Sequence, residues 1–204
     1  MNNHVCRGAV GSVLAATLAI AGAFSATPSP AAQSVGVRQT TLNVQRALQR
    51  LPRYGVFDFL AFTVDQGIVT LMGYAYRPEL KEEAAAALNG VSGVEEVANT
   101  IEILPSTPDD DRIRWQTFYN IYTDNFLSRY APGGPMRAQS EAISASRFPG
   151  REPTGNYPIH IIVKNRRTIL LGPVNSEADK TMAGVKARDV SGVFGVQNDL
   201  IVTK

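Results

Sequence analysis

The feature that most constrains the fold is an internal repeat, in which residues 64–103 align without a gap with residues 163–202, 99 positions later. Eleven of the 40 aligned positions are identical. The longest identical run is Val-Ser-Gly-Val, at 91–94 and again at 190–193. A repeat at a fixed spacing indicates structural units of one kind. Two copies predict a tandem pair of small domains.

Each copy has the pattern of a helix, two strands, a second helix and a third strand. In the first copy, apolar residues recur at helical spacing before Pro52 and then alternate with a period of two. The expected elements are a helix over 42–51, strands over 57–64 and 68–73 around a turn, a helix from Pro78, and a strand over 94–104. The predicted fold class is α/β (α+β), two modules that each have a three-stranded mixed sheet covered by two helices.

The turn between the first two strands differs between the copies. Asn165-Arg166 stands where the first copy has Gln66-Gly67. An arginine in place of a turn glycine predicts a longer or strained turn. Glycines expected to be structural are Gly67, Gly73, Gly93, Gly172 and Gly192.

The N-terminal segment differs in kind from the rest of the chain. Arg7 precedes an uncharged apolar run over 9–23, followed by small residues and prolines. This is typical of a secretory signal peptide, with cleavage after Ala23 or near Ala31-Ala32. The alternative is a short membrane anchor, but the run is below the ~20 residues that a spanning helix needs. Residues 1–32 are therefore assigned to a signal peptide and short arm, residues 33–40 to an exposed arm, and the protein to the periplasm or the secreted fraction.

Loss of this segment would remove Cys6, the only cysteine. The mature chain is then expected to contain no disulfide and no thiolate metal site. His160 would be its only imidazole, on the strand face opposite Ile159 and Ile161, where an ordinary structural role is expected. No nucleophile motif, metal-ligand spacing or phosphate-binding loop occurs. We therefore expect a non-enzymatic protein without catalytic residues, metal or other cofactors.

Charge divides unevenly between the two copies. Residues 40–104 carry five basic and eight acidic side chains, a net charge of −3, whereas residues 112–204 carry 13 and seven, a net charge of +6. Between them, residues 105–111 contain Asp109-Asp110-Asp111 and are expected to form a solvated acidic linker, or alternatively a loose divalent-cation site. A polyanionic surface would therefore meet the second module. Nucleic acid is a poor fit for a secreted chain of nearly balanced charge.

The second module, residues 112–204, differs most from the first at its start. Residues 111–130 predict a long helix rich in aromatic residues, with Trp115, Tyr119 and Tyr122 among them and arginines at its flanks. Such a stripe can cover the sheet of its own module. The alternative is a helix at a membrane interface, where tryptophan and tyrosine are enriched. Residues 132–158, rich in Pro, Gly, Ser and Arg, are expected to form an insertion without fixed structure, apart from a helix-like piece at 139–146.

The repeat resembles the BON (bacterial osmotic-stress and nodulation) domain family. The resemblance rests on the stretches 64–73, from Val64 through Gly67, Thr70-Leu71 and Gly73, and 91–99, from Val91 to Asn99. The second copy keeps the later stretch but lacks the turn glycine and the Thr-Leu pair. The resemblance implies a helix-strand-strand-helix-strand module of the cell envelope that attaches to phospholipid and has no catalytic residues.

Two functions follow as hypotheses. In the first, the second module docks on anionic phospholipid through aromatic and basic side chains: Arg112, Arg114, Trp115, Tyr119, Tyr122, Arg166 and Arg167. In the second, the chain is a protein–protein scaffold, because exposed sheet edges pair with partners and an acidic module can associate with a basic one in another copy. Envelope proteins are further candidate partners.

Overall fold

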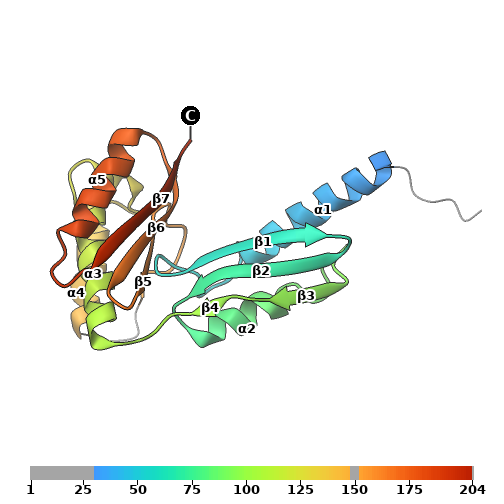
Figure 1. Cartoon of the computed structure of the whole chain (residues 1–204), viewed down its shortest axis with the longest axis horizontal. Helices are drawn as coiled ribbons and strands as arrows, with labels where there is room; N and C mark the ends of the chain where they lie inside the picture. The colour runs from blue at the N-terminus through green and yellow to red at the C-terminus, as the bar shows by residue number, and fades with distance from the viewer. Residues whose placement is uncertain (1–29, 148–151, 204) are drawn as a thin grey trace, which may run out of the picture.

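The computed structural model describes residues 30–147 and 152–203, which form two α+β modules that lie side by side (Figure 1). The predicted signal peptide lies outside the described residues. The first module is drawn out along the long axis, and its first helix extends beyond the sheet. The second module carries its helices on one face of its sheet, and the C-terminus ends its last strand.

The first module has a mixed β-sheet, with parallel and antiparallel strands, and helices pack on one face of it. Its elements are α1 (Pro30–Leu48), β1 (Phe59–Asp65), β2 (Ile68–Ala75), α2 (Pro78–Ala86), β3 (Glu96–Asn99) and β4 (Glu102–Ile103). Strand β2 pairs antiparallel with β1 and parallel with both β3 and β4. The expected third strand is therefore present as two short pieces along one edge. Its core includes Val44, Leu71 and Leu80, all of which are fully buried.

The second module repeats this arrangement with an added helix. Its elements are α3 (Pro108–Tyr122), the 3-10 helix η1 (Leu127–Tyr130), α4 (Pro135–Arg147), β5 (His160–Lys164), β6 (Arg167–Val174), α5 (Glu177–Arg188) and β7 (Gly195–Val202). The strand order is β5-β6-β7, with β5 antiparallel and β7 parallel to β6. The predicted fold class is confirmed, as two modules with mixed sheets and the same order of elements.

Two of the repeated residues tie the second helix of each module to its third strand. The amide nitrogen of Asn99 donates to the Lys81 carbonyl at 2.7 Å, and that of Asn198 donates to the Lys180 carbonyl at 2.6 Å. The glycines expected to be structural, Gly67, Gly73, Gly93, Gly172 and Gly192, all have positive φ. At Gly172 a β-carbon would lie 2.0 Å from the Pro158 carbonyl oxygen, so only glycine permits the close approach of these backbones.

Three expectations about irregular segments were wrong. The segment 33–40 is helical, as part of α1, which begins at Pro30. The buried Thr40 packs on Gly93 and so fixes this part of the helix to the first module. Within the insertion 132–158, residues 135–147 form α4, which packs against α3 and buries Ala138. The long aromatic helix is broken after Tyr122, where the Asp124 carboxylate accepts backbone N–H groups of the following residues and starts η1.

The expected acidic linker was also wrong in its structure. Thr107 caps α3 by accepting the N–H of Asp110, and the three aspartates form the first turn of that helix. Negative side chains at this position are stabilised by the positive end of the helix dipole. Asp110 is only 1% exposed, whereas the Asp109 and Asp111 side chains are 49% and 31% exposed, so the central carboxylate is not part of a solvated linker.

The two modules are joined by residues of the first module that are buried in the core of the second. Val56 and Phe57 precede β1, yet both are buried in the core of the second module. The Phe57 ring lies 5.1 Å from the Trp115 ring and 6.2 Å from the Phe118 ring. The N–H of Ile161 donates to the Val56 carbonyl at 2.8 Å. This segment of the first module therefore completes the second.

Candidate functional site

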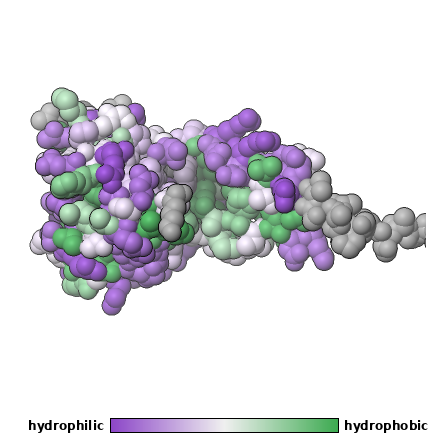
Figure 2. All heavy atoms as spheres, turned by 90° about the horizontal axis from the view of Figure 1, so that it is seen from above, coloured by the Kyte–Doolittle hydropathy of each residue, from purple (hydrophilic) through white to green (hydrophobic). Residues whose placement is uncertain are grey.

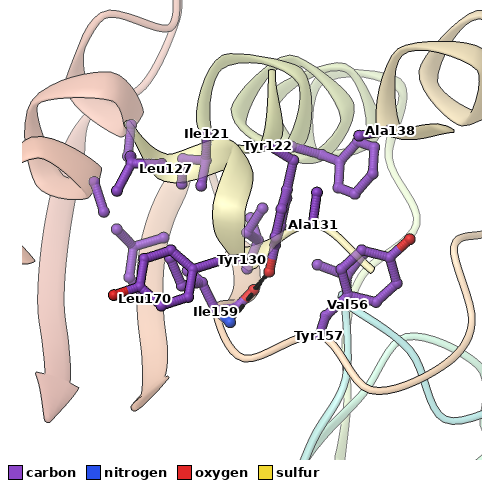
Figure 3. Close-up of a cluster of buried hydrophobic side chains, with 14 of the residues drawn as sticks. Val56, Ile121, Tyr122, Leu127, Tyr130, Ala131, Ala138, Tyr157, Ile159 and Leu170 are labelled. Carbon is purple, nitrogen blue, oxygen red and sulfur yellow. Dashed lines mark hydrogen bonds between the residues drawn. The ribbon is translucent and has the colours of Figure 1, made fainter. Parts of the chain in front are cut away.

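Two of the residues predicted to contact lipid are buried. Arg114 is 0% exposed, and its guanidinium donates to the carbonyls of Pro105 and Val163, both at 2.7 Å. The Tyr122 hydroxyl donates to the Ile159 carbonyl at 2.6 Å within the core of the second module (Figure 3). Neither side chain can reach a membrane in this fold. The alternative interpretation, in which the aromatic stripe covers the sheet, holds for most of this helix.

The other two aromatic candidates differ in exposure. Trp115 is half-buried, because its ring packs on Phe57 and Phe118 at the junction of the modules. Tyr119 is 41% exposed and lies on a different face of α3 from Trp115. It is on the same face as Arg112, two turns earlier in the helix. After the first turn of α3, the exposed residues are Arg112, Gln116 and Tyr119, which lie along one edge of the helix.

The turn at Asn165-Arg166 is strained but no longer than its counterpart. Both hairpins have two-residue loops, and Asn165 and Arg166 have φ values of 51° and 60°. Positive φ is uncommon for residues other than glycine. The N–H groups of Asn165 and Arg166 donate to the Asp110 carboxylate at 3.1 Å and 2.7 Å. This buried carboxylate holds the turn against the start of α3.

The anchored turn brings three of the predicted basic residues to one end of the second module. Arg166 and Arg167 belong to the turn and the start of β6, and the Arg112 guanidinium lies against Gly192. Phe194 follows two residues after that glycine, donates its N–H to the Arg166 carbonyl and is 68% exposed. The Arg166 guanidinium lies 5.3 Å from the centre of the Phe194 ring. We call this group, Arg112, Arg166, Arg167 and Phe194, the basic tip.

The charges of the basic tip are only partly neutralised. Arg166 forms an ion pair with Asp109, in which both side chains remain more than 40% exposed. Among the described residues, no carboxylate lies within ion-pair distance of Arg112 or Arg167. Two unpaired cations and an exposed aromatic ring therefore face solvent together.

The same end of the first module has the opposite chemistry. In the 99-residue register, Glu95 corresponds to Phe194 and Asp65 to Lys164. The first hairpin turn is thus flanked by the exposed acidic residues Asp65, Glu95 and Glu96, which we call the acidic tip. Sequence reasoning missed Phe194, although its place opposite a glutamate in the repeat was a usable signal. The two modules present different surfaces on the same scaffold.

The junction holds two titratable groups, His160 and Asp58, whose pKa values are shifted by burial. His160 is 7% exposed, and its Nε2 lies 3.3 Å from the Tyr54 hydroxyl. Burial lowers the pKa of His160 to about 4, so the imidazole is neutral at physiological pH. Burial also raises the pKa of Asp58 to about 6, although its carboxylate accepts the N–H groups of Gly55 and Tyr76. The contact between Tyr54 and His160 joins the two modules and gives His160 a structural role.

Neither a metal centre nor a membrane span occurs in the described part of the chain. Across residues 30–147 and 152–203, no group of three or more His, Cys, Asp or Glu side chains is arranged to hold a metal ion. Over the same ranges, every helix is too short or too polar to cross a bilayer. Figure 2 shows mainly hydrophilic residues on the outer surfaces of both modules, with hydrophobic residues gathered where the modules meet.

Comparison with known proteins identifies the family. The BON domain matches residues 38–105 and 141–204, which correspond to the two modules and cover more than half of the chain. The chain belongs to the BON domain family. The two matches agree with the tandem organisation inferred from the repeat. BON domains are non-catalytic binding domains of the cell envelope.

Other comparisons add little about this BON protein. No curated protein matches the chain. Two solved structures of CdsD, a structural protein of the type III secretion system of Chlamydia trachomatis, each align with 80% of the chain at 13% identity. The alignments cover 96% and 91% of those chains, with TM-scores of 0.24 and 0.26. Similarity this low does not bear on function.

Proposed function

We propose that this protein docks on anionic phospholipid surfaces of the cell envelope through the basic tip of its second module. The observation that carries the proposal is the convergence of Arg112, Arg166 and Arg167 around an exposed Phe194. The predicted signal peptide would deliver the chain to the periplasm. The role is one of binding and involves no catalysis.

The chemistry of the basic tip suits a phospholipid headgroup region. Each arginine near an anionic leaflet contributes about 1 kcal/mol to binding, and the guanidinium forms paired hydrogen bonds with phosphate oxygens. Phe194 supplies an apolar group that can enter the interface once the cations have brought the tip to the surface. Tyr119, on the exposed edge of α3, is the aromatic residue of the original prediction that remains compatible with this surface.

The rigidity of the tip supports the same role. Asp110 fixes the turn through two backbone hydrogen bonds, and Asp109 holds Arg166 beside Phe194. Side chains held in place lose less conformational entropy on binding than mobile ones. The strained turn therefore places the Arg166 side chain at the end of the second module, at the position where the first module has Gly67.

Vesicle flotation tests the electrostatic part of the proposal. The full chain should float with vesicles that contain phosphatidylglycerol and should stay unbound with phosphatidylcholine alone, with less binding as salt rises. The double variant Arg112→Glu and Arg167→Glu should abolish flotation. The matched control is Arg46→Glu, an exposed arginine of α1 in the first module. Equal binding by the double variant and the control would contradict the proposal.

A second pair of variants tests the aromatic part. Phe194→Ser should weaken vesicle binding by about tenfold, because the loss of one inserted aromatic side chain is worth one to two kcal/mol. Phe126→Ser is the control, because Phe126 is 66% exposed on the same module but lies outside the basic tip. A larger effect at Phe126 than at Phe194 would place the membrane contact elsewhere on this module.

A second candidate function is self-assembly into an envelope scaffold. It is favoured by the opposite charge of the two tips, with Asp65, Glu95 and Glu96 on one module and three arginines on the other. Head-to-tail contact between copies would bring the acidic tip to the basic tip. In analytical ultracentrifugation, the average mass of the protein should then increase with protein concentration at low salt. This increase should disappear at high salt. A monomer at every concentration would exclude this form of assembly.

A further inference from the structure

The acidic tip and the basic tip are built on the same backbone. The Glu95 N–H donates to the Gly67 carbonyl at 2.8 Å, and the Phe194 N–H donates to the Arg166 carbonyl at 2.8 Å. In each module the tip therefore consists of a hairpin turn bonded to the residue that leads into the third strand. The side chains differ, with carboxylates in the first module and with guanidinium groups and a phenyl ring in the second. The tips are two versions of one surface with opposite charge.

An exposed apolar side chain lies among the carboxylates of the acidic tip. Ile68, which is 42% exposed, pairs in the sheet with Asp65 on one side and with Glu96 on the other. Residues that pair directly across strands place their side chains on the same face of a sheet, so these three form one row. The next residue, Val69, points to the opposite face and is fully buried. The row therefore lies on the face of the first sheet that is open to solvent.

The carboxylates of the acidic tip are available to a partner. In the part of the chain that the structure describes, no lysine or arginine lies within ion-pair distance of any of them. The same holds for Arg112 and Arg167 of the basic tip with respect to carboxylates. Each tip thus combines unpaired charges of one sign with one exposed apolar side chain, Ile68 in the first module and Phe194 in the second. The two surfaces are complementary in charge and are matched in apolar content.

The two tips lie at opposite ends of the molecule. The β1–β2 turn is at the end of the first module that is remote from the second, and β7 begins on the side of the second module that is remote from the first (Figure 1). Because the modules share a core at their junction, one chain cannot bring its own tips together. Contact between the tips therefore requires two copies. It joins two unlike surfaces, so a pair of copies keeps one free acidic tip and one free basic tip.

We propose that the acidic tip of one copy binds the basic tip of another and competes with the membrane for the same arginines. The competition rests on the proposed docking of the basic tip on phospholipid. The carboxylates of the acidic tip pair with Arg112 and Arg167, and Ile68 packs against Phe194.

The contact between tips is weak enough to be displaced. A hairpin tip offers little area, and interfaces that bury less than about 1,200 Å² are typically transient. An anionic membrane presents many headgroups at once and so engages the basic tip repeatedly. Self-assembly and docking are then alternative states of one site, and the acidic tip restrains docking where no membrane is near.

Two double variants of the full chain, each with one intact tip, provide the test. Glu95→Gln with Glu96→Gln keeps the basic tip, and Arg112→Glu with Arg167→Glu keeps the acidic tip. The experiment is sedimentation velocity at a salt concentration of about 10 mM, where the Debye length is about 30 Å. Each variant alone should be a monomer. An equimolar mixture should form dimers and nothing larger, because each copy has a single functional tip.

A matched control separates the acidic tip from the net charge of the first module. Glu79→Gln with Glu82→Gln removes two exposed carboxylates of α2 outside the tip, and this variant should self-associate as the unaltered chain does. Glu95→Gln with Glu96→Gln should weaken self-association by at least about tenfold, because two ion pairs are lost. Equal self-association of these two variants would overturn the proposal.

Vesicles distinguish failure of this proposal from failure of the docking on which it rests. Phosphatidylglycerol vesicles added to the mixture should float the copy with the intact basic tip and leave the other copy in solution. A mixture that stays monomeric without vesicles, or flotation of both copies together, would overturn the proposal. If the copy with the intact basic tip does not float even without its partner, docking itself is wrong and the competition fails with it, whereas dimers in the mixture would still establish the contact between tips.

Discussion

Ile161 donates its backbone N–H to the carbonyl of Val56 at 2.8 Å, and this bond joins a strand of the second module to a segment that precedes the first strand of the first. Gly55 and Thr154 form a further bridge beside it, and the His160 ring contacts the Phe59 ring. The two repeats are therefore not independent domains on a flexible linker. They share a core at the junction, so the basic tip and the acidic tip have a fixed relative position.

Removal of Phe57 should destabilise the whole chain. The side chain is 1% exposed and packs on Trp115 and Phe118. Truncation of a buried phenylalanine costs about 3–5 kcal/mol, so Phe57→Ala should lower the free energy of unfolding by this amount and alter Trp115 fluorescence. Chemical denaturation measures the change. Phe126→Ala, at an exposed position, should stay within about 0.5 kcal/mol. A loss below about 1 kcal/mol for Phe57→Ala would show that the modules do not share a core.

Arg112 and Arg114 are two residues apart but should behave oppositely. Arg114→Met removes the donor to the Pro105 and Val163 carbonyls and the cation paired with Asp111, and loss of a donor to a buried acceptor costs about 1–3 kcal/mol. Arg112→Met should change stability by no more than about 0.5 kcal/mol but should weaken vesicle flotation. Denaturation and flotation of both variants provide the comparison. Normal stability of Arg114→Met would contradict the buried network.

The strained turn predicts different costs for two adjacent aspartates. Asp110→Ala removes the acceptor of two turn N–H groups and should destabilise the chain by about 1–3 kcal/mol. Asp109→Ala removes an exposed ion pair and should cost less than about 1 kcal/mol. Hydrogen exchange at Asn165 and Arg166 should quicken in the first variant only. Equal effects of the two substitutions would show that Asp110 does not hold the turn.

The junction also predicts how stability depends on pH. Burial lowers the pKa of His160 from 6.5 to about 4, so below pH 6.5 the unfolded chain binds a proton that the folded chain does not. Stability from this group is therefore lost as pH falls from 6.5 towards 4. Burial raises the pKa of Asp58 from 3.8 to about 6, so stability from Asp58 is lost as pH rises over nearly the same range. The two contributions oppose each other between about pH 4 and 6.

Substitution of Asp58 should expose the contribution of His160. Relative to the unaltered chain, Asp58→Asn should lose stability on acidification from pH 6 to 4, with a difference of up to about 1.4 kcal/mol per pH unit. His160→Gln should give a difference of opposite sign. Urea denaturation across this pH range measures both. Parallel pH profiles for the two variants would mean that neither group titrates with a shifted pKa in the folded state.

The sequence by itself determined the architecture. Eleven identities at a fixed spacing, with Gly73 and Gly172 where two backbones meet, specified two modules of one fold. Alternating apolar residues located the hairpins, and the loss of Gly67 in the second copy signalled the strained turn at Arg166. These features are local, because turn geometry and side-chain periodicity depend on residues close together in the chain.

Only the tertiary structure decided which side chains are available for binding. Arg114 and Tyr122 are residue types that are common at membrane interfaces, but both are buried. They contact Pro105, Ile159 and Val163, which lie outside α3. The helix α4 within the 132–158 insertion also depends on its packing against α3. Burial depends on contacts between residues far apart in the chain, so the basic tip around Phe194 could be recognised only in the assembled structure.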